Sequence, residues 1–479
     1  MKVLFVIDGL ALHHEPLGIM QLTACLRRAG HDAALLNGEA AGEGLADAVR
    51  ASGAGLVGFS STTGSHRMHL AMAARIKAAL PALPIVMGNA HPTFFPGVLD
   101  EEPCLDFICR GEGDDALVEL AHALEGRGDP AAIPNIDARL ADGSVRRNPL
   151  RPFREDLDAL PFPDRGILAG LTNAFEGATS YFISGRGCPY NCSYCFNHSM
   201  RSLAPGRYVR RRSVDNVIEE LRQVTRANRT RLVNFQDDTF ILDRQWVEEF
   251  VPRYRREIGL PYFCHVRANL VDERMAALLG ESGCVVACLG LETGNERLRN
   301  DVLRRNMSSE QILRACRLLR AAGMDVITQN MVGVPHETVA TFWQTLDLNR
   351  RAGARGVQIY HYRPHPGTDL ARLAHEEHLF SGDYDLVSKS YFERLDLTLP
   401  EGEVLDLLAR VGNLVIDVWA ARALVRAVLV LPVGRRVRRR VLEWLDRHQN
   451  GIRRRLGCRD SRWAPLERYQ RDAAPVRPT

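Results

Sequence analysis

Short apolar segments alternate with helical patterns in two separate series along this chain, and this alternation restricts the possible folds more than any other feature. The first series runs to about residue 135. Its strand patterns occupy 2–7, 33–36, 55–60, 84–88 and 107–109, and helical patterns at 18–29 and 69–80 lie between them. This alternation predicts an α/β domain with a doubly wound, Rossmann-like parallel sheet that binds ligands at the carboxyl ends of its strands.

The second series predicts a different α/β architecture. Its strand patterns occupy 181–184, 231–235, 262–264, 285–289, 325–328 and 356–360. Six β–α repeats favour a partial (β/α)6 barrel with its chemistry in the loops that follow the strands. We therefore expect a Rossmann-like domain at 1–135, a proline-rich linker at 136–176, a barrel at 177–375 and an α-helical region with a basic tail at 376–479.

Composition sets the class of protein and its expected compartment. A net charge of +4 does not by itself indicate a nucleic-acid partner, and 46% hydrophobic residues can fill several cores. The first residues have a strand pattern without the features of a signal peptide, and no uncharged apolar run reaches about 18 residues. Eleven cysteines, an odd number, then predict reduced thiols and a metal site. We expect a cytoplasmic protein without a transmembrane segment.

Three of the cysteines, Cys188, Cys192 and Cys195, share the spacing C-x3-C-x2-C. Three thiolates on a four-iron cluster leave one iron free to bind and activate a ligand, whereas a cluster with four cysteines is usually a closed electron carrier. The alternative is a structural zinc site, which needs four ligands, and His198 is the only nearby addition. The remaining cysteines mostly have apolar neighbours, which favours buried, inert thiols.

The cysteine loop, with Tyr194 directly before its third cysteine, resembles the signature of the radical S-adenosylmethionine (SAM) enzymes. The resemblance implies that Cys188, Cys192 and Cys195 hold a [4Fe-4S] cluster whose open iron chelates SAM. Reduction of the cluster would then cleave SAM to a 5′-deoxyadenosyl radical. Segments at 235–240, 290–294, 330–338 and 361–368 follow in the family's order. These segments imply SAM contacts from Tyr194, Asp237, Asp238, Glu292, Asn330, Gly333 and His361.

Two of these assignments have alternatives that the residues themselves leave open. Asp237 and Asp238 follow a strand, so they are also compatible with a general acid–base pair or a solvated loop. Glu292 is also compatible with a carboxylate near the start of a helix. Gly294, two residues later, would let the backbone approach a ligand closely.

The N-terminal domain resembles the cobalamin-binding domain that precedes the barrel in a large subclass of radical SAM enzymes. The resemblance rests on segments 15–19, 88–93 and 111–114, and with the barrel it covers about residues 1–370. It implies cobalamin contacts from Pro16, Leu17, Gly18, Ser60, Ser61, Gly88, Asn89, His91, Glu112 and Gly113. Asn89 stands where related domains usually have glycine, and asparagine tolerates positive φ better than most residues.

One cobalamin-binding motif is not matched. Some cobalamin proteins ligate cobalt through the histidine of D-x-H-x-x-G. Here Asp8, His13 and His14 are present, but His14 lies four residues before Gly18, and no aspartate stands two residues before it. The residue is therefore either a cobalt ligand in an unusual setting or a loop histidine without a metal.

Together the two resemblances imply a C-methyltransferase that uses methylcobalamin and acts on a small metabolite or natural-product intermediate, free or bound to a carrier. They also imply an electron donor such as flavodoxin or ferredoxin. The alternatives are an oxidative cyclase or ring rearrangement, a methylthiotransferase, and a non-catalytic cobalamin sensor. A methylthiotransferase needs further N-terminal cluster cysteines, and Cys25, Cys104 and Cys109 stand in the wrong context.

The C-terminal region is the part whose role the motifs leave unassigned. Arginines at 435–436, 438–440 and 453–455 follow an apolar stretch at 427–431. This pattern fits either a surface for an anionic membrane, nucleic acid or acidic carrier, or a solvated helical face.

Overall fold

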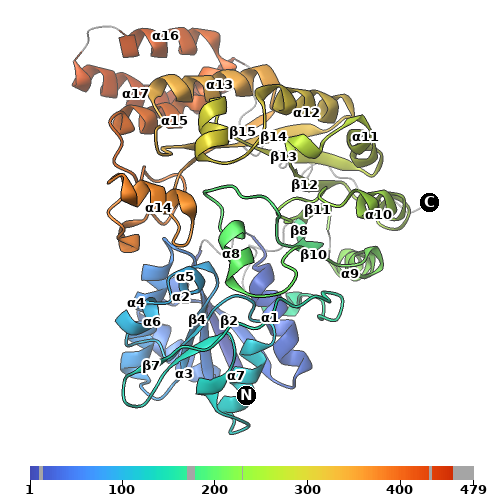
Figure 1. Cartoon of the computed structure of the whole chain (residues 1–479), viewed down its shortest axis with the longest axis vertical. Helices are drawn as coiled ribbons and strands as arrows, with labels where there is room; N and C mark the ends of the chain where they lie inside the picture. The colour runs from blue at the N-terminus through green and yellow to red at the C-terminus, as the bar shows by residue number, and fades with distance from the viewer. Residues whose placement is uncertain (10–13, 170–178, 229, 431–433, 457–479) are drawn as a thin grey trace.

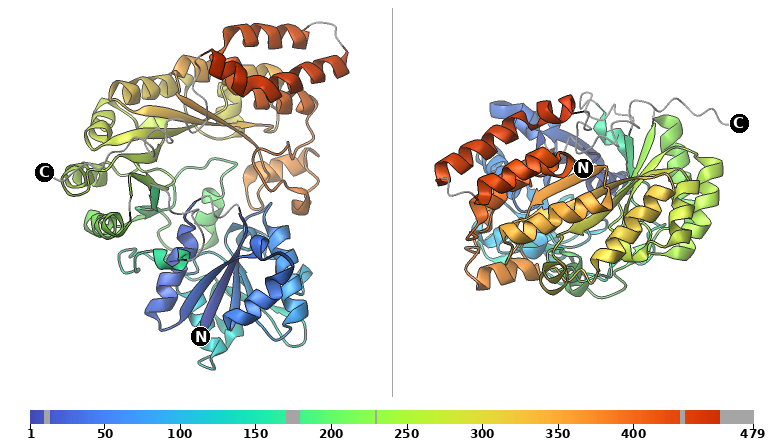
Figure 2. Two further views of the ribbon diagram at one scale, coloured as in Figure 1. Left: turned by 180° about the vertical axis from the view of Figure 1, so that it is seen from behind. Right: turned by 90° about the horizontal axis from the view of Figure 1, so that it is seen from above.

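The computed structural model describes residues 1–9, 14–169, 179–228, 230–430 and 434–456 (Figure 1). Within them, the chain forms an N-terminal sheet domain, a second sheet domain and a group of C-terminal helices at the end of the molecule opposite the N-terminal domain (Figures 1 and 2). None of the helices in these residues is long and apolar enough to cross a membrane.

The N-terminal sheet has the strand order β2-β1-β3-β4-β5-β6-β7. Its strands are β1 (Lys2–Ile7), β2 (Asp32–Asn37), β3 (Leu56–Ser60), β4 (Ile85–Gly88), β5 (Phe107–Cys109), β6 (Ile136–Arg139) and β7 (Val145–Arg146). The first five pair in parallel, as the strand–helix alternation predicts. Its helices are α1 (Leu17–Arg28), α2 (Gly38–Ala41), α3 (Leu45–Ser52), α4 (His66–Ala79), α5 (Ala90–Phe94), α6 (Val98–Glu101) and α7 (Ala116–Leu124).

Both faces of this sheet are covered by helices, because its strands are apolar on both faces. Val3, Phe5 and Ile7 of β1 pack with side chains of α1 and α7, whereas Leu4 and Val6 pack with those of α3 and α4. Successive strand residues point to opposite faces, so one continuous apolar strand supplies both cores.

The N-terminal sheet continues past residue 135 into segment 136–176, for which the sequence predicts a proline-rich linker. There, β6 pairs antiparallel with β5, and β7 pairs with β6. Both strands are short and β7 lies at the sheet edge, where exposed polar residues such as Arg146 conceal the strand pattern. Segment 136–176, which we expected to be a proline-rich linker, therefore contains two strands of the N-terminal sheet.

The second sheet is parallel throughout and keeps its strands in chain order, β8-β11-β12-β13-β14-β15, as a partial barrel requires. They are β8 (Thr179–Phe182), β11 (Leu232–Phe235), β12 (Tyr262–Val266), β13 (Cys284–Glu292), β14 (Asp325–Val332) and β15 (Gly356–His361). A separate antiparallel pair joins β9 (Gly185–Arg186) to β10 (Arg210–Arg211).

Helices follow the strands of this second domain, and most begin at a polar cap. They are α8 (Asn197–Leu203), α9 (Val214–Ala227), α10 (Arg244–Glu257), α11 (Glu273–Glu281), a π-helical turn (Leu298–Val302), α12 (Ser309–Ala321), α13 (Val339–Ala352) and α14 (Asp369–Glu376). Ser308 and Thr338 form capping boxes at the starts of α12 and α13. Such caps satisfy backbone N–H groups at a helix start.

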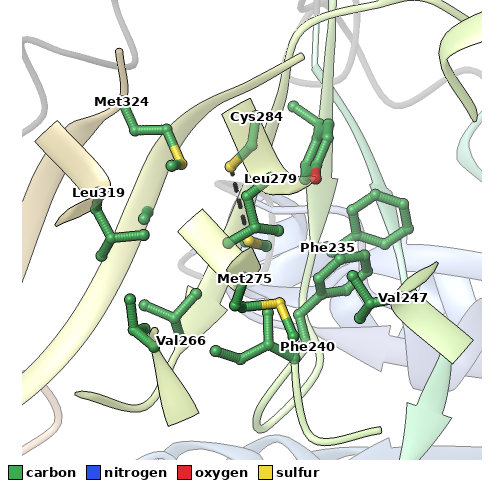
Figure 3. Close-up of a cluster of buried hydrophobic side chains, with 14 of the residues drawn as sticks. Phe235, Phe240, Val247, Val266, Met275, Leu279, Cys284, Leu319 and Met324 are labelled. Atoms are coloured by element: carbon green, nitrogen blue, oxygen red, sulfur yellow. Dashed lines mark hydrogen bonds between the residues drawn. The ribbon is translucent and has the colours of Figure 1, made fainter. Parts of the chain in front are cut away.

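The largest core lies between the second sheet and the helices on its outer face. Figure 3 shows how Phe235, Phe240, Val247, Met275 and their neighbours meet there. The thiols of Cys264 and Cys284 lie 3.8 Å apart in the same core. Outside the cysteine triplet, every cysteine in the described residues is buried, which agrees with their interpretation as inert thiols.

The C-terminal region is helical, as predicted. It contains α15 (Gly402–Asp417), α16 (Trp419–Val430) and α17 (Arg435–Arg455). Helix α15 packs against α13 and β15, while α16 and α17 contact α15 and each other. The last two helices therefore form an outer layer on the second domain (Figures 1 and 2).

Candidate active site

The cysteine segment (residues 185–200) leaves the second sheet after β8 and runs through β9 into α8. Cys192 is buried, and Cys188 and Cys195 are half-buried. Ser193 anchors the segment, because its backbone N–H donates to the Leu303 carbonyl at 3.1 Å and its hydroxyl donates to the Val302 carbonyl at 2.6 Å. The π-helical turn thus fixes the middle of the segment.

Each of the three thiols has a polar neighbour. Asn197 Nδ2 lies 3.3 Å from Cys195 Sγ, and Thr239 Oγ1 lies 4.0 Å from Cys188 Sγ. Burial raises the pKa of Cys195 to about 12. A metal would replace that proton and hold the sulfur as a thiolate. The donor set therefore suits a thiolate-held cluster.

Two buried guanidinium groups point at Cys192. Arg267 Nη1 lies 3.5 Å from its sulfur, and Arg305 Nη1 lies 3.8 Å from it. Arg267 also stacks on the Tyr190 ring at 3.6 Å. Two cations beside one thiolate would stabilise its negative charge and that of a cluster bound to it. Sequence reasoning missed both arginines, since neither belongs to a local motif.

Arg305 connects this sulfur to the predicted SAM residues Tyr194 and Glu292. It donates to the Tyr194 hydroxyl at 2.9 Å, and that hydroxyl donates to Glu292 Oε1 at 2.9 Å. Burial raises the pKa of Tyr194 well above its ordinary value, so the phenol stays protonated and donates. Glu292 has a φ of +66° at the irregular end of β13. Such a backbone is uncommon outside glycine and is found where a side chain must be placed for function.

A cavity of about 440 Å³ opens beside this network, and we call it the aromatic cavity. Among the predicted SAM residues, Tyr194, Glu292 and His361 line it. The other lining residues are Cys195, Phe196, Gln329, Met331, Tyr360, Tyr362, Arg363, His365 and Tyr391. His361 Nε2 lies 2.9 Å from Asp406 Oδ1.

The other predicted SAM residues lie elsewhere. Asp237 is buried and accepts hydrogen bonds from the Ser184 hydroxyl and backbone N–H, so it caps the end of β8. Asp238 is exposed and accepts from Asn197 Nδ2 at 3.1 Å. Both line a separate cavity near β10.

Asn330 and Gly333 are engaged within the protein. Asn330 is fully buried, donates to the Gln358 carbonyl and accepts from Asn349 Nδ2 at 2.7 Å. Gly333 has a φ of +83° and donates its N–H to Glu337 Oε2 at 2.6 Å. Asn330 therefore joins β14 to β15 and α13, and Gly333 belongs to the loop before α13.

A second cavity, of about 340 Å³, lies between the two sheet domains, and we call it the interdomain cavity. It opens at the carboxyl ends of β3, β4 and β5 and reaches Arg186, Gly187 and Met200 of the cysteine segment. Six predicted cobalamin residues line it: Gly18, Ser60, Gly88, Asn89, Glu112 and Gly113. Asn89 has the positive φ expected of it, at +81°, and its Nδ2 donates to Ser60 Oγ.

The remaining predicted cobalamin residues are not among the described residues that line this cavity. Pro16 caps α1, and Leu17 lines a smaller neighbouring cavity. Ser61 Oγ lies 2.6 Å from His69 Nδ1, and His91 Nδ1 lies 3.0 Å from Thr63 Oγ1, both within the protein. Burial lowers the pKa of His91 to about 3, so its ring is neutral.

The described part of the interdomain cavity contains no histidine. His14 Nδ1 lies 2.9 Å from the Tyr181 hydroxyl, and His13 lies outside the described residues. Glycines form much of the wall, and a side chain at Gly18 would meet open space. Small residues at strand ends leave room for a broad, flat ligand, so the cavity fits a corrin ring.

Arginines join the two domains across this cavity. Arg186 contacts Asp114 at 2.7 Å and Glu112 at 3.0 Å, and Arg210 contacts Glu112 at 2.9 Å. Although burial opposes ionisation, hydrogen bonds and charge from Arg210 and Arg186 hold the pKa of Glu112 below its ordinary value. Glu112 therefore acts as an anionic junction between the domains.

The described residues do not provide a set of ligands for the alternative, a structural zinc site. Within the described residues, no three His, Cys, Asp or Glu side chains converge closely enough to hold a single metal ion. His198, the nearest candidate for a fourth ligand, has Nε2 3.7 Å from Asp369.

Comparisons with known proteins agree with this geometry. Residues 182–348 match the model of the radical SAM superfamily, and residues 3–121 match the model of the B12 binding domain. The chain is a cobalamin-dependent radical SAM enzyme. Its cofactors are accordingly a [4Fe-4S] cluster, SAM and cobalamin.

Relatives with assigned names support this family. The chain is 27% identical over 365 residues to an uncharacterized methyltransferase of Pyrococcus horikoshii, covering 75% of this chain and 78% of the relative. It is 29% identical over 304 residues to the anaerobic magnesium-protoporphyrin IX monomethyl ester cyclase of Rubrivivax gelatinosus, covering 61% of this chain and 54% of that cyclase. The relatives thus carry the names of two different reactions.

Solved structures show the same fold. The cobalamin-dependent radical enzyme OxsB, with aqua-cobalamin and SAM bound, has a TM-score of 0.67 at 17% identity and covers 94% of this chain and 71% of that one. The radical SAM methyltransferase TsrM from Kitasatospora setae, with cobalamin and a [4Fe-4S] cluster bound, has a TM-score of 0.64 at 19% identity, with coverages of 78% and 75%. The predicted fold class, a Rossmann-like domain followed by a partial barrel and helices, is confirmed.

Proposed function

We propose that this radical SAM enzyme transfers a methyl group from cobalamin to a carbon atom of a small metabolite or natural-product intermediate. The observation that supports it is that residues of one segment, the cysteine segment, line both cavities. Gly187 and Met200 of the cysteine segment line the interdomain cavity, and Cys195 and Phe196 line the aromatic cavity. A methyl donor in the first cavity and a substrate in the second would meet at one segment.

When bound, the cluster and SAM supply the radical that activates the substrate carbon, and cobalamin supplies the methyl group. The three cysteines would hold the cluster. Arg267 and Arg305 would compensate its negative charge from one side. We propose that Glu292, held by Tyr194 and Arg305, orients the SAM ammonium group at the edge of the aromatic cavity.

The aromatic cavity would bind and orient the substrate. Phe196, Tyr360 and Tyr391 offer ring faces, and the guanidinium of Arg363 is already occupied by the carbonyls of Thr63 and Lys389. Burial lowers the pKa of His365 to about 3, and its Nε2 lies 3.3 Å from the Tyr391 hydroxyl. A neutral imidazole among aromatic rings suits an uncharged, flat or apolar substrate and offers it a hydrogen-bond acceptor.

Product analysis of the reconstituted enzyme tests the proposal. The full chain would be reconstituted anaerobically with iron, sulfide and hydroxocobalamin, then given SAM, a chemical reductant and a panel of candidate substrates. Methyl transfer predicts equal amounts of S-adenosylhomocysteine and 5′-deoxyadenosine together with a methylated product. A flavodoxin or ferredoxin should replace the chemical reductant if our expectation about the electron donor holds.

Two variants separate the cofactors in this experiment. Cys192→Ala should lose its cluster iron and SAM cleavage, and retention of both would show that the cluster assignment is wrong. Gly18→Phe should lower bound cobalamin and methyl transfer but keep the iron, because the ring would enter the interdomain cavity. Gly44→Phe is the matched control, since Gly44 is exposed on the same domain with open space around it.

Oxidative cyclisation or ring rearrangement is the second candidate, favoured by the similarity to the magnesium-protoporphyrin ester cyclase. It needs the same radical but no methyl transfer. Formation of 5′-deoxyadenosine with a cyclised or rearranged product, and without S-adenosylhomocysteine, would support it over methylation.

A further inference from the structure

Helix α16 exposes an apolar face that the proposed chemistry does not use. One side of the helix is buried and includes Val425 and Val428. The opposite side is exposed and carries no charge along the series Ala420, Ala423, Leu424, Ala427 and Val430. These positions follow i, i+3, i+4, i+7 and i+10, so they share one face of the helix.

The exposure of this face is substantial at its two largest side chains. Leu424 is 47% exposed and Val430 is 85% exposed. A contiguous apolar face on a surface helix marks an interaction site more often than scattered single residues do. Arg426 flanks this face, with its guanidinium over the Trp343 ring at 4.8 Å.

Helix α17, which contacts α16, combines strong positive charge with exposed apolar side chains. Its 21 residues include nine arginines but only two acidic residues, Glu443 and Asp446. Val437 is 51% exposed and Trp444 is 48% exposed, while Leu442 and Leu445 are buried against the protein. The outward side therefore carries a tryptophan and a valine among arginines.

We propose that the exposed faces of α16 and α17 dock on an anionic lipid bilayer. Arginines would meet the lipid phosphates, and the apolar side chains, with Trp444, would enter the boundary between headgroups and acyl chains. The positive charge would also bind nucleic acid, but nucleic acid has no apolar surface that an exposed aliphatic face would contact. The combination of both features on adjoining helices therefore favours lipid over nucleic acid.

The position of these helices is compatible with catalysis at the membrane surface. They lie at the end of the molecule opposite the N-terminal domain (Figures 1 and 2). Docking would leave the N-terminal domain and the interdomain cavity away from the bilayer. Because no described helix can span a membrane, the chain would lie on the bilayer by these helices.

Vesicle binding by the full chain tests this proposal. Cosedimentation would be measured with vesicles of phosphatidylcholine alone and with vesicles that also contain phosphatidylglycerol. We expect binding only to the anionic vesicles, weakening as salt is raised. Replacing three exposed arginines, Arg436→Gln, Arg440→Gln and Arg447→Gln, should weaken it at least about tenfold.

A matched variant controls for the change in net charge. Arg256→Gln, Arg274→Gln and Arg297→Gln remove three exposed arginines from helices of the radical SAM domain and should leave vesicle binding unchanged. Equal weakening by the two triple variants would overturn the proposal. So would binding of the wild type to duplex DNA without binding to anionic vesicles.

Insertion of the apolar side chains is tested separately from charge. Brominated lipids should quench tryptophan fluorescence in the wild type, and Trp444→Phe should remove most of that quenching. Leu424→Ser should weaken binding at constant net charge, because the residue is exposed in the free protein and buried in the bilayer. Full quenching in Trp444→Phe, or unchanged binding by Leu424→Ser, would contradict this mode of docking. Unchanged melting temperature and iron content would show that each variant is folded.

Discussion

Glu337 makes the radical SAM domain less stable as the pH rises, a direction that few carboxylates produce. Its side chain is 3% exposed in the loop between β14 and α13, where Oε2 accepts the Gly333 N–H at 2.6 Å. Oε1 has no hydrogen-bond partner among the described residues. Burial raises the pKa of Glu337 from 4.5 to about 8.

The sign and size of the effect follow from these two pKa values. Between pH 4.5 and about 8 the folded protein keeps the Glu337 proton, whereas the unfolded chain has lost it. The contribution of Glu337 to the free energy of unfolding is therefore complete below pH 4.5 and is lost as the pH rises to about 8. Each pH unit removes about 1.4 kcal/mol, so the whole interval removes up to about 5 kcal/mol.

Glu337→Gln should remove this dependence, because an amide keeps the acceptor for Gly333 and does not titrate. Urea denaturation of both proteins over about pH 5 to 9 would measure it. We expect the wild type to lose stability relative to the variant as the pH rises. Glu273→Gln, an exposed residue at the start of α11, should run parallel to the wild type. Parallel profiles for wild type and Glu337→Gln would refute the reasoning.

Three further predictions concern the site and its supports. Gly294→Ala should fail to fold or lose at least about 3 kcal/mol of stability, because its Cβ would lie 2.1 Å from the Gln344 carbonyl oxygen; soluble yield and thermal unfolding measure this. Arg267→Gln should lower the reduction potential of the cluster by about 60 mV, because a cation beside Cys192 favours the more negative reduced state. A redox titration followed by electron paramagnetic resonance would detect this shift. An unchanged potential would exclude an electrostatic role of Arg267 at the cluster. Arg186→Met should lower the stability by about 3 kcal/mol, measured as a lower melting temperature, because it leaves carboxylates at the domain junction without a cation. It should also lower the amount of bound cobalamin. An unchanged cobalamin content would show that the ion pairs at the domain junction do not support the interdomain cavity.

The sequence predicted the features that have a local pattern. Parallel strands such as β1 are recognisable because they are continuously apolar, and the three cysteines are recognisable because they share one short segment. Strands β6 and β7 were missed because short edge strands with polar residues lack that pattern. Local pattern thus predicted the architecture and the candidate cluster ligands.

Residues that depend on the tertiary structure could not be predicted in the same way. Arg267 and Arg305 lie 75 and 113 residues from Cys192 in sequence and meet it only in the folded chain. Conversely, Asn330 and His91 belong to segments that resemble binding motifs, yet the amide of Asn330 and Nδ1 of His91 are engaged inside the protein. A motif places a segment near a ligand but does not determine which of its side chains faces that ligand.

Arg186 has a consequence for how the holoenzyme is assembled. It lies two residues before Cys188, and its carboxylate partners belong to the other domain. Any hinge motion that opens the interdomain cavity would therefore pull directly on β9, the strand that leads into the proposed cluster ligands. We therefore expect binding of cobalamin and binding of the cluster to influence each other, so that the order in which the two cofactors enter affects the yield of active enzyme.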